Sequence, residues 1–306
     1  MNIAELISNW QLSFASAGDN TLITGSPNRT ERRFLFSDAQ KNFYIAEGYN
    51  SGKTRFQIRQ NILLEYLAGQ SLSGIHPFIR TGSGTHGVPS DGLFWQLRPY
   101  IPAEKLPRTV LGQQENYGQR CGEFLLQLKE IMTAPAAPAA QNAPFYMANY
   151  LPSLLELSQR KMPEITGQLR EISGELAPFF KWERQSSGMF AHGDFHPGNI
   201  LMSNGKIQAV IDWEFAGIKF PGYDMALLIG CLAMDDPDNL DSPAVRRLQD
   251  LLYRNEFMPD EAWEHLPQMI AATRLGWLGE WLSLDETTLV KQEMELLAIL
   301  LENFTC

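Results

Sequence analysis

One short segment, between Phe190 and Glu214, constrains this chain more than any other part of its sequence. Its loop His192–Asn199 (HGDFHPGN) contains two glycines and a proline, and it carries Asp194 and Asn199 five residues apart. A turn and an apolar strand then lead to Asp212. Because a hairpin reverses the chain, we expect Asp212 to return beside the loop. Three oxygen-bearing side chains are therefore predicted at loop or strand ends, where a ligand can reach them.

These side chains suit phosphoryl transfer. That reaction requires a carboxylate that holds and deprotonates the attacking hydroxyl, and oxygen ligands that fix Mg²⁺ against the phosphates. Mg²⁺ prefers hard oxygen ligands and is often held by one or two carboxylates together with phosphate oxygens. The alternative interpretation is a metal cluster of His192, Asp194 and His196, but no further ligand motif accompanies these residues.

The first hundred residues are predicted to form strands around one helix. Apolar and aromatic runs predict strands at residues 21–25, 32–36, 42–47 and 93–101, and residues 54–68 have helical spacing that ends at Gly69. From about residue 113 the pattern becomes helical, with candidate helices at 117–132, 150–180, 243–255, 267–282 and 286–303. The expected architecture is therefore a small α+β lobe followed by a larger, mainly helical lobe.

Three spaced motifs in this chain carry a resemblance to a known family. The sequence HGDFHPGNIL, followed by VIDWEFA and then by GYDMA, resembles the aminoglycoside phosphotransferase and choline kinase family of kinase-like enzymes. The resemblance implies a two-lobed, α+β, protein-kinase-like fold. The nucleotide-binding lobe would cover residues 1–100 with a hinge near 95–102, and the catalytic and substrate-binding lobe would cover 103–306. The implied activity is an ATP-dependent transfer of a phosphoryl group, with Mg²⁺, to a hydroxyl of a small molecule that is choline-, thiamine- or aminoglycoside-like.

The same resemblance implies a role for each residue of the motifs. Asp194 would be the catalytic base, and Asn199 and Asp212 would be the Mg²⁺ ligands. Asp224 would be a buried brace that accepts hydrogen bonds from the catalytic loop, and His192 would orient that loop rather than react.

The first lobe departs from the family pattern. Kinases of this fold use a strand lysine that grips the phosphates and a helix glutamate that pairs with it. The lysine should stand at Ala46 or Glu47 and the glutamate at about Gln60, but none of these residues has the expected side chain. The candidate replacement cations are Arg33, Lys53 and Arg55.

Two further parts of a nucleotide site can be placed. The segment Trp95–Tyr100 resembles the hinge that offers backbone groups to adenine, and the alternative is an ordinary strand exit. Its candidate cofactor-binding residues are Leu97, Arg98 and Tyr100. The turn that covers the phosphates would be Gly25–Thr30, which contains a single glycine.

The acceptor is expected to be cationic. Residues 224–306 contain 5 basic and 16 acidic side chains, whereas residues 1–223 contain 20 and 19. A negative surface would concentrate a cationic substrate, although solvated acidic helix faces explain the same numbers. Stacked indoles beside a carboxylate suit an ammonium group, whereas two tryptophans four residues apart usually form a core stripe. The candidate acceptor-binding residues are Glu214, Trp277, Glu280 and Trp281.

Composition argues against other classes of partner. A formal net charge of −10 disfavours nucleic acid and anionic membranes, and no apolar run reaches the roughly 18 residues of a membrane span. Three scattered cysteines favour a reducing cytoplasm, and residues 1–14 lack the pattern of a signal peptide. We expect a cytoplasmic monomer or homodimer.

A second hypothesis is a non-catalytic kinase-like module that binds a ligand or partner, since both members of the lysine–glutamate pair are missing. A protein Ser/Thr kinase is the least supported function. Only Glu214–Pro221 separates Asp212 from Gly222, which leaves no recognisable activation segment.

Overall fold

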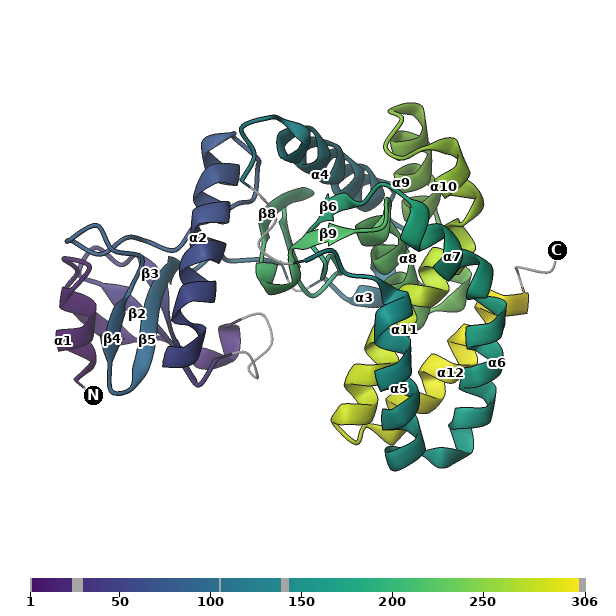
Figure 1. The fold of residues 1–306 in the computed structure, drawn as a ribbon. Helices are drawn as coiled ribbons and strands as arrows, with labels where there is room; N and C mark the ends of the chain where they lie inside the picture. The colour runs from purple at the N-terminus through teal and green to yellow at the C-terminus, as the bar shows by residue number, and fades with distance from the viewer. Residues whose placement is uncertain (1, 24–29, 105, 139–142, 303–306) are drawn as a thin grey trace. The chain divides into compact units, whose positions relative to one another are not determined.

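The structure, a computed structural model of the 306-residue chain, describes residues 2–23, 30–104, 106–138 and 143–302 (Figure 1). The chain packs into two compact units. The first unit comprises Met1–Glu104, Pro135–Pro138 and Gly198–Glu214, and the second comprises Lys105–Ala134, Ala139–Pro197 and Phe215–Cys306. The predicted α+β class is confirmed, because an antiparallel sheet forms the N-terminal region and helices dominate the C-terminal part. The lobe boundary near residues 95–102 stays a prediction.

The first unit is built on a five-stranded antiparallel sheet with the order β1-β2-β3-β5-β4. The strands are β1 (Phe14–Ala17), β2 (Arg32–Asp38), β3 (Phe43–Asn50), β4 (Val88–Ser90) and β5 (Leu93–Pro99). Asp38 closes the β2–β3 hairpin, because its carboxylate accepts hydrogen bonds from the backbone N–H groups of Gln40 (2.9 Å) and Asn42 (2.8 Å).

The two faces of this sheet differ in chemistry. Side chains alternate along each strand, so Ala46 and Leu97, which are paired in the register, share one face. They belong to an apolar core that includes Leu6 and Ile7 of helix α1 (Ile3–Ser8). The opposite face carries charged residues beside the buried Leu35 and Ile45: the register places on it Glu47 of β3, Arg33 of β2 and Arg98 of β5.

Helix α2 (Thr54–Gly69) and a hairpin from much later in the chain complete the first unit. This hairpin joins β7 (Ile200–Ser203) to β8 (Lys206–Val210). Its predicted turn is confirmed, because Asn204 and Gly205 have φ values of 50° and 66°, as a two-residue hairpin turn requires.

One predicted strand is wrong. The sequence predicts a strand at residues 21–25, but Asn20–Leu22 forms a turn of 3₁₀ helix. The Asp19 carboxylate accepts hydrogen bonds from Thr21 N–H (2.9 Å) and Thr21 Oγ1 (2.7 Å), which favours the turn over an extended backbone. The first strand is instead β1, and residues 24 and 25 lie outside the described residues.

In its described part, the second unit is mainly helical. The predicted helical stretch at 150–180 divides where Pro163 and Pro178 begin new helical segments. A small sheet pairs β6 (Met189–Ala191) with β9 (Gly217–Lys219). The helices are α3 (Arg108–Leu111), α4 (Glu115–Thr133), α5 (Met147–Lys161), α6 (Thr166–Glu175), α7 (Ala177–Gln185), α8 (Tyr223–Asp235), α9 (Pro243–Arg254), α10 (Asp260–Glu264), α11 (Leu266–Ser283) and α12 (Thr287–Glu302).

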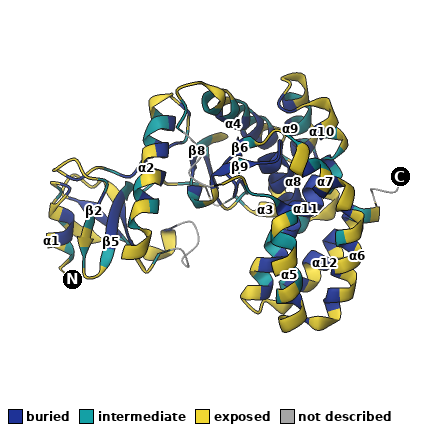
Figure 2. Ribbon diagram, in the orientation of Figure 1, coloured by how far each residue is buried: buried dark blue, intermediate teal, exposed yellow. Residues whose placement is uncertain are grey.

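Helix α8 lies at the centre of the second unit. Its residues from Tyr223 to Ala233 are all buried, and Figure 2 shows it dark blue, whereas α5 and α6 expose much of their surface. Gly222 precedes the helix with φ 83°, a conformation that glycine adopts without steric cost. Among the described helices, none is long and apolar enough to cross a membrane.

Candidate active site

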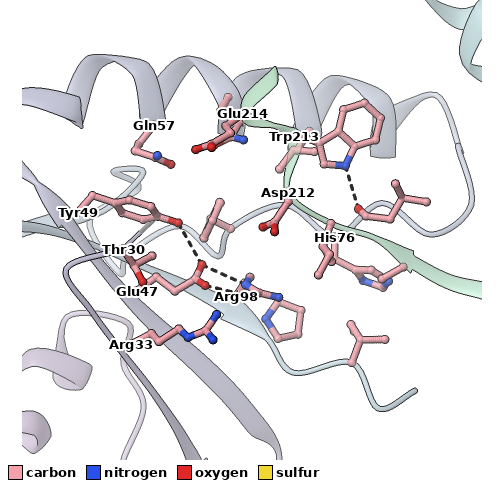
Figure 3. Close-up of a pocket in the computed structure, with 18 residues that line it drawn as sticks. Thr30, Arg33, Glu47, Tyr49, Gln57, His76, Arg98, Asp212, Trp213 and Glu214 are labelled. Carbon is pink, nitrogen blue, oxygen red and sulfur yellow. Dashed lines mark hydrogen bonds and ion pairs between the residues drawn. The ribbon is translucent and has the colours of Figure 1, made fainter. Parts of the chain in front are cut away.

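A cavity in the first unit gathers several of the predicted site residues (Figure 3). Strands β2, β3 and β5 contribute Arg33, Glu47 and Arg98. The segment that follows β8 contributes Asp212 and Glu214. Four residues that the sequence singles out for binding, Arg33, Arg98, Asp212 and Glu214, therefore surround one cavity.

An ion pair between β3 and β5 forms one wall of this cavity. Arg98 donates hydrogen bonds from Nε to Glu47 Oε2 and from Nη2 to Glu47 Oε1, both at 3.1 Å. Tyr49 Oη also donates to Glu47 Oε2, at 3.1 Å. The side chains of Arg98 and Glu47 are only 13% and 7% exposed. Burial by itself would lower the pKa of Arg98, but the Glu47 carboxylate raises it, so the guanidinium stays charged.

The geometry of this pair leaves one edge of the guanidinium unused. Nε and one Nη2 proton face Glu47, whereas Nη1 and the second Nη2 proton make no hydrogen bond to any residue that the structure describes. A guanidinium edge with two parallel N–H groups matches two oxygens of a phosphate. Glu47 thus binds one edge of the Arg98 guanidinium, and the other edge can bind a ligand.

The structure also shows where the residues lie at which a lysine and its partner glutamate were expected, Ala46, Glu47 and Gln60. Ala46 faces the apolar core, whereas Glu47 and Gln60 both line the cavity. The ion pair of this cavity therefore takes its cation from β5 and its carboxylate from β3. Arg33 lines the same cavity, but the other two candidate cations, Lys53 and Arg55, are not among its lining residues.

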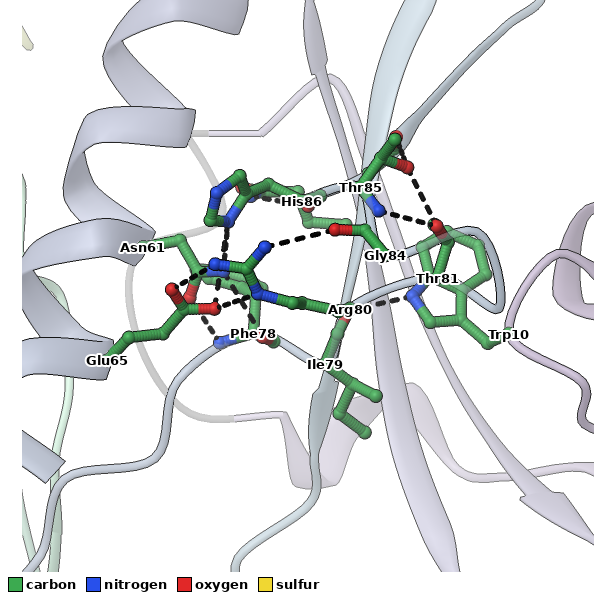
Figure 4. A network of polar contacts seen from close by, with 12 residues as sticks. Trp10, Asn61, Glu65, Phe78, Ile79, Arg80, Thr81, Gly84, Thr85 and His86 are labelled. Atoms are coloured by element: carbon green, nitrogen blue, oxygen red, sulfur yellow. Dashed lines mark hydrogen bonds and ion pairs between the residues drawn. The ribbon is translucent and has the colours of Figure 1, made fainter. Parts of the chain in front are cut away.

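A polar network holds helix α2 in place within the first unit (Figure 4). Asn61 is fully buried; its Oδ1 accepts a hydrogen bond from Phe78 N–H (2.7 Å), and its Nδ2 donates to Phe78 O (3.2 Å). One turn later, Glu65 accepts two hydrogen bonds from Arg80, both at 2.7 Å. Because Phe78 lines the cavity, these contacts fix the face of α2 that presents Gln57 and Gln60.

The other two predicted cofactor-binding residues lie outside the cavity lining. Leu97 is buried in the apolar core on the opposite face, and its carbonyl accepts a hydrogen bond from Ile79 N–H (2.6 Å). Tyr100 N–H donates to Phe43 O (2.9 Å), and the two rings meet edge to face. Their role as a hinge stays a prediction. Of the expected phosphate-covering turn, residues 25–29 lie outside the described residues.

Asp212 reaches the cavity from an unusual backbone conformation. Its φ of 63° is left-handed, which is uncommon and mildly strained for a residue with a side chain. The adjacent Ile211 N–H donates to Asn199 O (3.0 Å), so the hairpin brings the segments of Asn199 and Asp212 together. A carboxylate and an amide are hard oxygen donors, and they fit Mg²⁺ completed by phosphate oxygens and water.

No metal site is formed by protein ligands alone within the described ranges, where no group of three or more His, Cys, Asp or Glu side chains could hold an ion. The alternative cluster of His192, Asp194 and His196 therefore has no support.

In the second unit, Asp224 holds the backbone of the loop that contains Asp194. Its carboxylate accepts hydrogen bonds from His192 N–H (2.7 Å) and Gly193 N–H (2.8 Å). His192 Nδ1 accepts a hydrogen bond from Asp194 N–H (3.1 Å), so this ring nitrogen carries no proton. Burial raises the pKa of Asp224 to about 6, although the two backbone N–H groups act in the opposite direction.

Lys219 is a charged residue beside this loop that the sequence analysis did not single out. It ends β9 and is only 7% exposed. Its Nζ lies over the rings of Phe145 (5.0 Å) and Tyr223 (5.1 Å). One signal could have drawn attention to it, because it is the only basic residue between Asp212 and Asp224.

The two tryptophans suggested for the acceptor have partners within the second unit. Their ring centroids are 5.2 Å apart on α11. The Arg274 guanidinium lies 5.7 Å over the Trp277 ring, and Trp281 Nε1 donates to Glu293 (3.1 Å), the buried ion-pair partner of Arg274. These contacts favour the core-stripe interpretation.

One contact connects the tryptophans with the loop. The His196 ring meets Trp277 edge to face at 5.2 Å, and His196 Nε2 lies 3.6 Å from Asp194 Oδ1. Glu280, on the same helix as the tryptophans, is exposed. The structure therefore brings Trp277 near the loop of Asp194, and the acceptor role of α11 stays a prediction.

Comparisons with known proteins identify a family and proteins of similar fold. A model of the phosphotransferase enzyme family matches residues 27–280. A comparison with curated protein sequences found no match. Among solved structures, an aminoglycoside phosphotransferase from Alicyclobacillus acidocaldarius has a TM-score of 0.64 at 12% identity, over 98% of this chain and 96% of that one.

Two further solved structures are similar over most of the chain. A thermostable mutant of aminoglycoside phosphotransferase APH(4)-Ia, in a ternary complex with AMP-PNP and hygromycin B, has a TM-score of 0.67 at 17% identity and covers 99% and 98% of the two chains. An amicoumacin kinase in complex with AMP-PNP and Ca²⁺ has a TM-score of 0.61 at 15% identity and covers 90% of each chain. At these identities the similarity is one of fold.

Proposed function

The chain belongs to the phosphotransferase enzyme family, and from that premise we propose that it transfers the terminal phosphoryl group of ATP to a hydroxyl group of a small cationic molecule, with Mg²⁺. The observation that carries this proposal is the first-unit cavity, where Arg33 and Arg98 lie with Asp212. A triphosphate and its metal require cations and a carboxylate together. The complexes of similar proteins with AMP-PNP, and with AMP-PNP and Ca²⁺, support the choice of nucleotide and a divalent metal.

In this proposal, Arg98 takes the part that a strand lysine has in related kinases. Glu47 and Tyr49 fix one edge of its guanidinium, and the other edge binds phosphate oxygens. Arg33 supplies a second cation in the same cavity. The planar guanidinium of Arg98 is already oriented by Glu47, so it loses little conformational entropy when it binds a phosphate.

The metal would be held by Asp212 and Asn199. When bound, Mg²⁺ would neutralise charge on the phosphate oxygens. The strained backbone of Asp212 supports this assignment, because strain of this kind persists where a side chain must be aimed at a ligand.

Asp194 would act as the general base. As the acceptor oxygen forms its bond to the terminal phosphorus, the bond from that phosphorus to the bridging oxygen breaks, and Asp194 takes the hydroxyl proton. The products are ADP and a phosphate ester. Asp224 and His192 would keep Asp194 in position through the loop backbone.

A cationic acceptor is supported by charge. The excess of acidic side chains lies in residues 224–306. The acceptor-binding residues in this proposal are Glu214, Trp277, Glu280 and Trp281, and the amino-alcohols and aminoglycosides are the acceptor classes that fit. The complex of a similar protein with hygromycin B supports the second class.

The test combines binding with turnover. MgATP should raise the melting temperature of the wild-type protein, because a ligand that binds only the native state stabilises it. Arg98→Met should reduce this shift, and Asp194→Asn should keep the shift but lower ADP release at least ~1000-fold with any acceptor that supports turnover. A panel of amino-alcohols, aminoglycosides and sugars identifies that acceptor.

Arg246→Met is the control, since Arg246 also pairs with a carboxylate, that of Asp241, but lies in the second unit and does not line the first-unit cavity. It should leave the MgATP shift unchanged. Equal shifts for Arg98→Met and wild type would contradict the assignment of Arg98. Turnover that survives Asp194→Asn would contradict the mechanism.

A second candidate function is a non-catalytic ligand-binding module, which is favoured by the carboxylate of Glu47 where a lysine was expected. It predicts no thermal shift at millimolar MgATP. Either function suits a reducing cytoplasm, because Cys121 and Cys231 are buried and unpaired.

A further inference from the structure

Lys219 is a buried cation for which the described residues provide no anionic contact. The residue is 7% exposed, and its Nζ makes neither a hydrogen bond nor an ion pair with any of them. A buried ammonium without a hydrogen-bonding partner is costly, and the ring faces of Phe145 and Tyr223 offset only part of that cost. Such a group is retained where a ligand completes its environment.

The side chain of Lys219 packs against the loop that contains Asp194. Lys219 pairs with Met189 in the β6–β9 sheet, and the loop begins directly after β6. A Cβ at position 193 would lie 2.6 Å from Lys219 Cε and closer still to the backbone oxygen of Phe215, so the Lys219 side chain packs against the loop at a position that has room only for glycine. Gly193 also has φ 84°, which excludes most other residues.

The charge environment identifies the kind of ligand. Burial lowers the pKa of Lys219, and the negative charges of Asp224 and Asp194 act in the opposite direction. Neither carboxylate has an oxygen within 4.0 Å of Lys219 Nζ, so neither forms an ion pair with it. Nζ is not fully enclosed and keeps some solvent-accessible surface. An ammonium that is reachable and has unused N–H groups takes an anionic oxygen.

We propose that Lys219 binds an oxygen of the phosphoryl group as that group arrives at Asp194. The inference rests on the proposed function, because Asp194 must lie within hydrogen-bond reach of the hydroxyl that attacks the phosphorus. Negative charge spreads over the three equatorial oxygens of the phosphoryl group during transfer. Lys219 offsets this negative charge and so reduces the repulsion between the phosphoryl group and Asp194. Before the phosphoryl group arrives, the ammonium lies over the rings of Phe145 and Tyr223.

The first measurement uses inorganic phosphate as the probe and needs no turnover. In an Arg33→Met and Arg98→Met background, which removes the other two proposed phosphate-binding cations, increasing phosphate should still raise the melting temperature. The added substitution Lys219→Met should abolish this increase, whereas Lys129→Met should not. Lys129 is a matched control, because its Nζ also lies over a ring (Phe257, 5.8 Å) but is bonded to Glu256 O.

The second measurement separates binding from chemistry. Lys219→Met should lower kcat about 100-fold to 1000-fold and change the MgATP dissociation constant less than about threefold, because the contact forms during transfer. Lys219→Arg should recover part of kcat. Circular dichroism checks folding, and removal of a buried, unpaired charge is expected to leave the protein at least as stable.

The outcomes distinguish this inference from the proposed function. If Lys219→Met retains the phosphate response and a kcat within about threefold of Lys129→Met, the inference is overturned. If the wild-type protein transfers no phosphoryl group but loses its phosphate response on Lys219→Met, the proposed function fails and the anion site stands.

Discussion

Arg98 and Glu47 are 51 residues apart in the chain and adjacent on the sheet. The antiparallel register sets Arg98 opposite Ile45, so its guanidinium reaches the neighbouring Glu47 on the same face. Each charge depends on the other, because removing one partner of a buried ion pair leaves an uncompensated charge. The buried glutamate on β3 therefore depends on the arginine on β5.

The buried carboxyl of Asp224 predicts a pH dependence of stability. Burial raises its pKa from an ordinary value of 3.8 to about 6. The native state therefore binds a proton that the unfolded chain releases, so the contribution of Asp224 to the free energy of unfolding is fully present below about pH 4 and is lost as the pH rises through about 6. Wild type should lose about 3 kcal/mol relative to Asp224→Asn across this window.

Urea unfolding of both proteins at a series of pH values checks this prediction. Asp224→Asn is the reference, because an amide does not titrate. Above about pH 7 the two curves should run parallel. Parallel curves over the whole range would show that Asp224 titrates at its ordinary pKa.

At the scale of helices, α4 and α9 pack closely at a glycine. A Cβ on Gly118 would overlap the backbone carbonyl of Ala244, which cannot move aside as a flexible side chain could. The sequence places Gly118 within the apolar stripe of α4, where glycine costs helix stability. Its presence there is explained by the approach of α9.

We predict that Gly118→Ala lowers the free energy of unfolding by about 3 kcal/mol, because the two helices must separate. Gly174→Ala on α6 is the control, since a Cβ there would meet no atom within 4 Å. It should stabilise the protein by about 0.5 kcal/mol through helix propensity. Chemical denaturation measures both variants, and equal effects would contradict the packing argument.

At the scale of the whole molecule, the charge is unevenly distributed along the chain. Residues 224–306 carry 16 acidic and 5 basic side chains, whereas the rest of the chain is nearly balanced. Some of this charge is internally compensated, because Glu293 is fully buried with Arg274. The remainder includes exposed residues such as Asp260 and Glu280, which act through solvent.

This distribution predicts a dependence on salt. Raising NaCl from about 50 mM to about 500 mM should increase KM for a cationic acceptor about threefold or more, because screening weakens attraction between exposed charges. KM for a neutral sugar acceptor, if one is used, should change less than KM for the cationic one. Steady-state kinetics at both salt concentrations makes the comparison, and equal changes would argue against electrostatic attraction of the acceptor.

Much of the candidate site follows from local sequence. The spacing of Asp194, Asn199 and Asp212, with the turn at Asn204–Gly205, predicts a loop and a hairpin, because short-range turns depend on the conformational preferences of a few residues. The α+β class follows in the same way from periodicity. The turn at Asn20–Leu22 was not predicted, since the hydrogen bond that the Asp19 carboxylate accepts from Thr21 N–H outweighs the strand pattern.

Pairings between distant residues were decided by the tertiary structure. The sequence shows that the expected lysine is absent, but the register of β3 and β5 determines that Arg98 meets Glu47. The His192–Asn199 loop is equally visible in the sequence, but the cation packed beside it is not. In the sequence, Lys219 is a single basic residue in a mostly apolar stretch, and only the pairing of β9 with β6 places its side chain against Gly193. Such contacts depend on burial and strand pairing, which bring together residues whose local sequences contain no mutual signal.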